Sequence, residues 1–225
     1  MVMEDSVGTH TSTGTGQVVA PAGAHRCVQP MIDASVTMVG DALRRSTVWA
    51  RMIDGSLPFM GRAAYLEQHW EGLRVLRNSL ESTGLCAQLR PALTDTVERL
   101  GGALDRSHTT ATWREHHVTM PAMLEFRRRV NEMTEARDAV GLAAHAVVRL
   151  AAVKSCPMPG EPTHIAIPPV TCVRTDEDEE YFAEELSAAT LLVLAHGSDV
   201  CRSYHNSMRS SSCAVTAAAI RQALM

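Results

Sequence analysis

The segment AVGLAAHAVVRLAAV, residues 139–153, carries the strongest structural signal of the chain, because only His145 and Arg149 interrupt its apolar side chains. A helix that is apolar on nearly every side is stable only where other elements cover it all round. Such a position is found in the middle of a helical bundle. We therefore expect an all-α fold in which this segment is the central helix.

Amphipathic stripes on both sides of this segment supply the helices that would cover it. Apolar residues recur three or four positions apart, the spacing of one helix face, in segments 32–43, 66–80, 93–104, 123–133 and 182–193. Pro91 and Pro121 stand where a first helical turn tolerates proline, and Gly55, Pro58 and Gly61 mark a break. The sequence thus predicts a bundle of six or more helices, the last of which starts at residue 175 or 176.

The remaining segments define the expected domain organisation. Residues 1–29 are rich in Gly, Thr, Ser and Val without a helical period, which predicts a disordered leader. Residues 30–206 form one helical domain, and residues 207–225 read as a linker followed by a short Ala-rich tail helix. Five prolines between residues 157 and 169 exclude a regular helix between the central and the last long helix.

Composition excludes several classes of function. The chain has 21 Lys and Arg against 25 Asp and Glu, a net charge of −4, which gives no basic surface for nucleic acid or an anionic membrane. No apolar run approaches the ~18–20 residues of a membrane span. The N-terminus lacks the pattern of a signal peptide, and the six cysteines are scattered. We expect a cytoplasmic protein with reduced thiols.

Five segments resemble the bacterial, biliverdin-producing heme oxygenase family. STVWARMIDGSLPFMGRAAYLEQHW is similar to the family's second-helix region, and GLAAHAVVRL resembles the helix that lies over the heme. The matching segments are 46–70, 90–106, 113–126, 141–150 and 175–200. The resemblance implies a heme-oxygenase-like multi-helix bundle, and an activity that cleaves heme to biliverdin, CO and iron.

The position of the family's iron ligand departs from this pattern. In that family a histidine on the first helix binds the heme iron, and the same register places Gly40 there. No histidine occurs between His25 and His69, so a small shift in register does not restore the ligand. Glycine has no side-chain donor for iron.

The helix over the heme departs as well. The family's Gly-Asp pair, which admits the porphyrin and organises water near bound dioxygen, is replaced by Ala152 and Val153; Cys156 and Pro157 replace a glycine pair. A valine accepts no hydrogen bond from water. The resemblance also implies basic partners for the heme propionates, and no Lys or Arg occurs between Lys154 and Arg174.

These departures predict a degenerate family member that does not cleave heme, with no catalytic residue and no resident cofactor. We expect it to bind a tetrapyrrole, another apolar small molecule or a protein partner. Gly40, Arg149, Ala152 and Cys156 would line what remains of the pocket. Because Gly40 and Ala152 are small, the first and central helices could also close together and remove the heme slot.

Two enzymatic alternatives stay open at this point. A working heme oxygenase would use His145 or Cys156 as a replacement iron ligand, although a lone histidine on a central helix is more often a hydrogen-bonded core residue. A non-heme di-iron oxidase would need carboxylates and histidines from several helices. Glu67 and Glu71 lie one turn apart, but we expect them to be an exposed pair near Arg74.

Two charged or polar runs are expected to face solvent. The tandem pair His116-His117 lies between two predicted helices, which predicts exposed imidazoles. The run of arginines at 127–129 is typical of a solvated helix face.

Overall fold

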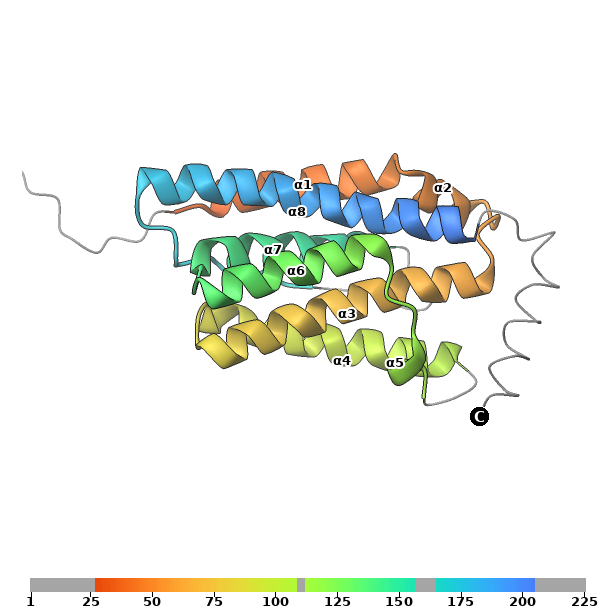
Figure 1. Cartoon of the computed structure of the whole chain (residues 1–225). Helices are drawn as coiled ribbons and strands as arrows, with labels where there is room; N and C mark the ends of the chain where they lie inside the picture. The colour runs from red at the N-terminus through yellow and green to blue at the C-terminus, as the bar shows by residue number, and fades with distance from the viewer. Residues whose placement is uncertain (1–26, 109–111, 157–164, 205–225) are drawn as a thin grey trace, which may run out of the picture.

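The structure, a computed structural model, describes residues 27–108, 112–156 and 165–204 (Figure 1). This part of the chain contains eight α-helices and one short 3-10 helix, and it contains no β-strand. The helices are α1 (Gln29–Arg44), α2 (Thr47–Ile53), α3 (Phe59–Thr83), η1 (Ala87–Leu89), α4 (Arg90–Ser107), α5 (Trp113–His116), α6 (Pro121–Glu135), α7 (Ala139–Ser155) and α8 (Asp176–Ser203). The predicted all-α class is confirmed.

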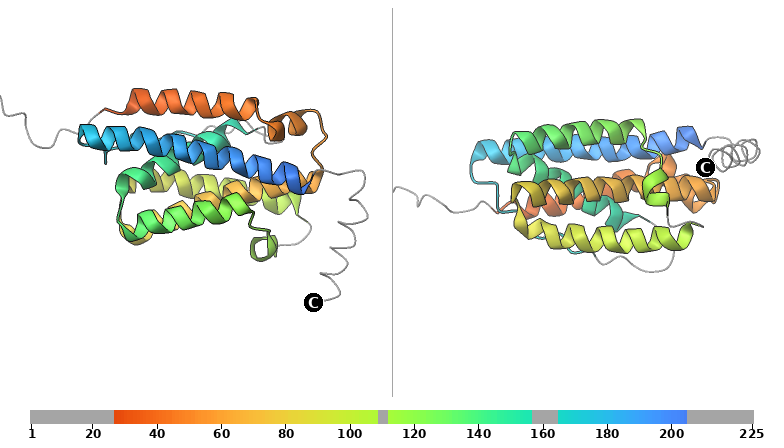
Figure 2. Two further views of the ribbon diagram at one scale, coloured as in Figure 1. Left: turned by 45° about the horizontal axis from the view of Figure 1, so that its top comes forward. Right: turned by 60° about the horizontal axis from the view of Figure 1, so that its bottom comes forward.

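Helix α7 is the centre of the bundle, as its sequence predicts. Every residue from 140 to 153 is buried. Helices α1 and α8 form one layer, α6 and α7 the next, and α3 and α4 the third (Figures 1 and 2). α7 packs against members of all three layers. Its apolar surface is therefore covered from every side, which is the condition that makes such a helix stable.

Side-chain caps explain where several helices begin and end. The Thr175 hydroxyl accepts a hydrogen bond from the Asp178 amide, and the Asp178 carboxylate accepts one from the Thr175 amide, which is a reciprocal capping box at the start of α8. Asp138 caps α7 by accepting from the Gly141 amide at 2.8 Å. Gly84 ends α3 in the left-handed region at φ 71°, which glycine adopts without strain.

Some expected boundaries were wrong. Gly61 does not belong to the break, because it lies in the first turn of α3. A Cβ at this position would come within 2.9 Å of Leu57 and 3.2 Å of Tyr204. The short helices α2 and α5 were not predicted. Helix α1 begins at Gln29, one residue before the expected start of the helical domain. Residues 1–26 of the expected leader and the expected linker and tail at 207–225 lie outside the described residues.

The described part of the connection between α7 and α8, residues 165–174, contains no helix, and Pro168 and Pro169 lie within it. Residues 165–174, which we call the return strap, lead to the start of α8 at the opposite end from the last turn of α7 (Figures 1 and 2). Ile165, Val170 and Val173 of the strap are buried in the main core. The strap is therefore held to the bundle by apolar side chains.

Candidate functional site

The predicted site lies where α1 packs against α7. Gly40 of α1 is buried, and a Cβ built on it would lie 3.0 Å from Oγ of Ser155 in the last turn of α7. Ala152 and Val153 are buried as well. The two helices therefore touch at the residue that stands at the family's iron-ligand position.

The residues at this contact do not fit a heme. Gly40 presents hydrogen atoms only, so it supplies no iron ligand, and Ser155 occupies the space next to it. A porphyrin would enter between α1 and α7 only after the two helices had moved apart and Gly40 had lost its contact with Ser155. We therefore derive no chemical step through a heme at this place.

Arg149 lies in a different part of the molecule. Its guanidinium carbon is 4.4 Å from the centroid of the Phe126 ring on α6, and its Nη1 is 2.8 Å from Nδ1 of His196 on α8. On the α3 side it fills the space over Gly72, where an added Cβ would come within 2.9 Å of Nε and Cζ. Arg149 thus packs among α3, α6 and α8, and the structure does not bring it together with Gly40.

A buried polar cluster surrounds this arginine. We define it as Arg149, His69 and His196, which are all buried. Among the described residues, no hydrogen-bond partner reaches Nε or Nη2 of Arg149, either ring nitrogen of His69, or Nε2 of His196. Burial lowers the pKa of Arg149 to about 9, and burial together with the arginine charge lowers the pKa of both histidines. The cluster holds one cation and two neutral imidazoles.

Cys156 packs in a small apolar cluster with Tyr65, Met120 and Val200. Burial raises the pKa of its thiol to about 12. A thiol in this environment stays protonated at neutral pH, whereas metal ligation by cysteine uses the thiolate. The structure therefore places Cys156 in the core and gives no support to its use as an iron ligand.

His145 is a hydrogen-bonded core residue. Its Nε2 lies 3.1 Å from a carboxylate oxygen of Glu185 on α8, and the imidazole side chain is buried. Burial lowers the pKa of His145, while the hydrogen bond to Glu185 acts in the opposite direction. Arg129 of α6 pairs with the same carboxylate. Nε2 is therefore engaged by Glu185, whereas Nδ1 is buried and has no hydrogen-bond partner among the described residues.

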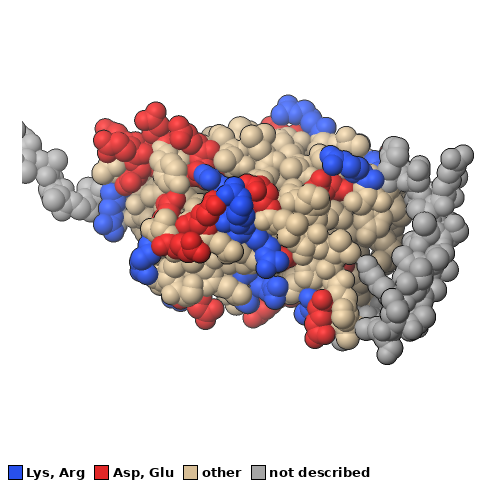
Figure 3. Space-filling model, viewed as in Figure 1, with Lys and Arg blue, Asp and Glu red and all other residues tan. Residues whose placement is uncertain are grey.

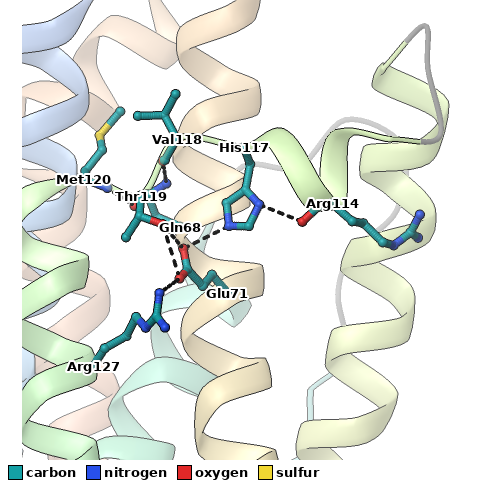
Figure 4. Close-up of polar contacts among 8 residues, drawn as sticks. All are labelled: Gln68, Glu71, Arg114, His117, Val118, Thr119, Met120 and Arg127. Carbon is teal, nitrogen blue, oxygen red and sulfur yellow. Dashed lines mark hydrogen bonds and ion pairs between the residues drawn. The ribbon is translucent and has the colours of Figure 1, made fainter. Parts of the chain in front are cut away.

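Glu71 is the centre of a polar network that the sequence did not reveal (Figure 4). Its carboxylate lies 3.0 Å from Nε2 of His117 and 3.3 Å from Nη1 of Arg127, and the Thr119 hydroxyl donates to it at 3.3 Å. Next to it on α3, the Gln68 side chain donates to the Val118 carbonyl and accepts from the Met120 amide. Together these contacts fix the connection between α5 and α6 on α3.

This network corrects several expectations. Glu67 and Glu71 are not an exposed pair, because both are buried, and Glu67 lies 2.8 Å from Nε2 of His108. His116 is exposed as expected, but the His117 side chain is only 8% exposed. Two of the three arginines at 127–129 pair with buried carboxylates. The run is therefore only partly a solvated face.

The charges of the Glu71 network follow from its contacts. Burial alone would raise the pKa of Glu71, but the hydrogen bond from His117 and the charge of Arg127 outweigh it, so that the pKa is lowered. The hydrogen bond to Glu71 raises the pKa of His117. Within the part of the chain that the structure describes, no group of three or more His, Cys, Asp or Glu could hold a metal ion. The network therefore orders the α5–α6 connection, and the di-iron alternative gains no support from it.

Comparison with known proteins finds similarity among solved structures only. No family model and no curated protein matches the sequence. Among solved structures, the heme oxygenase from Leptospira interrogans is similar, with a TM-score of 0.53 and 15% sequence identity over 77% of this chain and 99% of that chain. The fold is heme-oxygenase-like. At this identity the match establishes the fold and carries no activity with it.

The surface adds two observations. Within the described ranges, no helix has both the length and the apolar character needed to cross a membrane. Figure 3 shows acidic side chains gathered over the start of α8, and basic and acidic side chains interleaved over the middle of the same face. A face with this mixed charge is unlike the continuous basic surface that nucleic-acid binding uses.

Proposed function

We propose that this chain is a binding protein with a heme-oxygenase-like fold and without heme-cleaving activity. The glycine at position 40 and the close approach of Ser155 carry the proposal, because glycine supplies no iron ligand and Oγ of Ser155 lies 3.0 Å from where a Cβ at this position would be. The protonated Cys156 supports it, since a buried thiol offers no thiolate ligand to iron. Without a heme site, the part of the fold that would bind a partner is the surface of its helices.

We expect this surface to bind a protein partner rather than an apolar small molecule. Three large apolar side chains at the end of α2 and the start of α3 are at least half exposed, namely Ile53, Phe59 and Met60. We call this group the apolar corner. These three residues are close in the sequence, and contiguous exposed apolar surface marks protein–protein contact sites. The α1–α7 contact, by contrast, offers a tetrapyrrole no room.

A hemin titration of the purified full-length chain tests the proposal. We expect no saturable Soret band beyond that of free hemin, and no biliverdin when a reductant and dioxygen are added. The matched variant is Gly40→His, which supplies a ligand at the family's position and keeps the residue at 155 a serine, whose Oγ lies 3.0 Å from the added Cβ. We expect this variant to give no band either, because the helix contact still closes the site.

The opposite results have distinct meanings. A Soret band for the unmodified chain at one equivalent, with turnover to biliverdin, would overturn the proposal, and His145→Ala and Cys156→Ala would then identify the ligand. A band for Gly40→His alone would show that α1 and α7 separate readily. In that case the missing donor, and not the closed contact, would account for the absence of heme binding.

A further inference from the structure

Two cysteines that are far apart in the sequence meet at one end of the bundle. Cys86 lies in the turn between α3 and α4, and Cys172 lies in the return strap. Both thiols donate to one acceptor, the backbone carbonyl of Ala139 at the start of α7, at 3.3 Å and 3.4 Å. Nearby, the Gln88 side chain donates to the Thr171 hydroxyl at 3.1 Å, which fixes the strap against the turn. The two sulfur atoms are therefore held side by side.

The backbone at Cys86 supports a specific role for its side chain. Cys86 has a φ of 45°, in the left-handed region that residues other than glycine rarely adopt. A strained backbone of this kind persists only where surrounding contacts fix it, and such positions cluster at functional sites. This backbone conformation directs the Cys86 side chain towards the Ala139 carbonyl and the return strap.

The two thiols differ in the direction in which their pKa is shifted. The interaction between the two neighbouring thiols lowers the pKa of Cys172 and raises that of Cys86. Burial and the carboxylates of Asp138 and Asp178 oppose ionisation of Cys172 but do not outweigh this interaction. The thiolate is the nucleophile in disulfide exchange, and the lowered pKa favours Cys172 as the attacking thiol. Both residues are only partly buried, which gives a small reagent access.

We propose that Cys86 and Cys172 are a reversible disulfide site that reacts with a low-molecular-weight disulfide of the oxidised-glutathione type. The Cys172 thiolate attacks one sulfur of the reagent, whose S–S bond breaks and releases one small thiol, leaving a mixed disulfide on Cys172. Cys86 then loses its proton, and its sulfur attacks that of Cys172 and releases the second small thiol. Two protein thiols are oxidised, and one reagent disulfide is reduced to two thiols. This site is independent of the proposed binding function.

Thiol mapping of the full-length chain tests the site without any substitution. The protein is incubated with oxidised glutathione, free thiols are alkylated, and the peptides are identified by mass spectrometry with and without dithiothreitol. We expect a link between residues 86 and 172 that dithiothreitol removes. We also expect the midpoint of thermal unfolding to rise by roughly 5–15 °C in the linked form, because the link constrains the unfolded chain. Alkylation of both cysteines after the incubation would overturn the proposal.

Serine variants identify the attacking thiol. Cys86→Ser should retain a glutathione mixed disulfide on Cys172, since the attacking thiol remains and its partner is absent. Cys172→Ser should leave Cys86 free. Cys201→Ser, the matched control at a cysteine elsewhere in the fold, should form the 86–172 link as the unmodified chain does. A mixed disulfide on Cys86 in the Cys172→Ser variant would contradict the assigned order of attack.

Discussion

At the residue scale, the buried charges and imidazoles of this chain differ in how well they are paired. Glu71 has His117, Arg127 and Thr119 around it, whereas Arg149 has one hydrogen bond, to His196, and the face of Phe126. A buried ion whose charge is matched stabilises the fold more than one that has lost its water without a counter-charge. The Glu71 network is therefore where ionisation should have a measurable effect on stability.

The pair of His117 and Glu71 predicts a pH-dependent stability. Because the pKa of His117 is raised above its unfolded value, the pair stabilises the folded state fully below that unfolded pKa of 6.5, and the contribution is lost as the pH rises through the folded pKa. His117→Gln should therefore lower the free energy of unfolding by about 1 to 2 kcal/mol near about pH 6, and by less near about pH 9. Chemical denaturation at both pH values measures this difference.

The neighbouring histidine provides the control for this prediction. His116 is exposed, so His116→Gln should change the free energy of unfolding equally little at both pH values. An effect of His117→Gln that is as large at the alkaline as at the acidic pH would show that His117 acts through packing and not through its charge.

At the element scale, close contacts between helices depend on glycine. Gly72 of α3 lies against the Arg149 guanidinium of α7, which an added Cβ would meet at 2.9 Å. Gly102 of α4, by contrast, has only the end of Arg106 within reach of an added Cβ, at 3.8 Å. The same substitution at these two glycines should therefore have opposite effects on stability.

Gly72→Ala should lower the free energy of unfolding by about 1 to 3 kcal/mol, because the guanidinium of the buried Arg149 would have to shift away from Phe126 and His196. Gly102→Ala should raise it by about 0.5 to 1 kcal/mol, because alanine favours the helix and meets no obstacle. Urea denaturation of the two variants measures both values. A Gly72→Ala variant as stable as the unmodified chain would mean that α3 and α7 are less closely packed at this point.

The elements were largely predictable from the sequence, and the polar networks were not. The stripes at 32–43 and 123–133 and the apolar run at 139–153 are local patterns, and each of them became a helix where it was expected. Glu71 and His117 are 46 residues apart, and Arg149 and His196 are 47 apart. No local period relates such positions, because it is the bundle that brings them together. Gly40 was identifiable only through the family resemblance, and its contact with Ser155 required the structure.

At the scale of the whole molecule, one apolar core connects the bundle. The main cluster contains residues from α1, α3, α4, α6, α7, α8 and the return strap. Trp70 and Trp113 pack against each other within it, with ring centroids 4.9 Å apart. A fold in which one main core spans most of the helices is expected to lose its helices and its side-chain packing in the same transition.

This shared core predicts coincident unfolding curves. Far-ultraviolet circular dichroism reports the helices, and tryptophan fluorescence reports the surroundings of Trp70 and Trp113 together with Trp49 on α2. We expect both signals to change at the same urea concentration with the same apparent free energy of unfolding. A fluorescence transition that precedes the loss of helix would mean that the layer of α3 and α4 unfolds separately from the rest.

The central position of α7 also has a consequence for how the chain is made. A ribosome synthesises residues 139–155 before residues 176–203, yet α8 is one of the helices that cover α7. Until α8 has emerged, the most apolar helix of the chain has an uncovered side, and uncovered apolar surface makes nascent chains prone to aggregate. The core is thus completed only when α8 has been translated. A chaperone that binds apolar segments would act on the chain before that point.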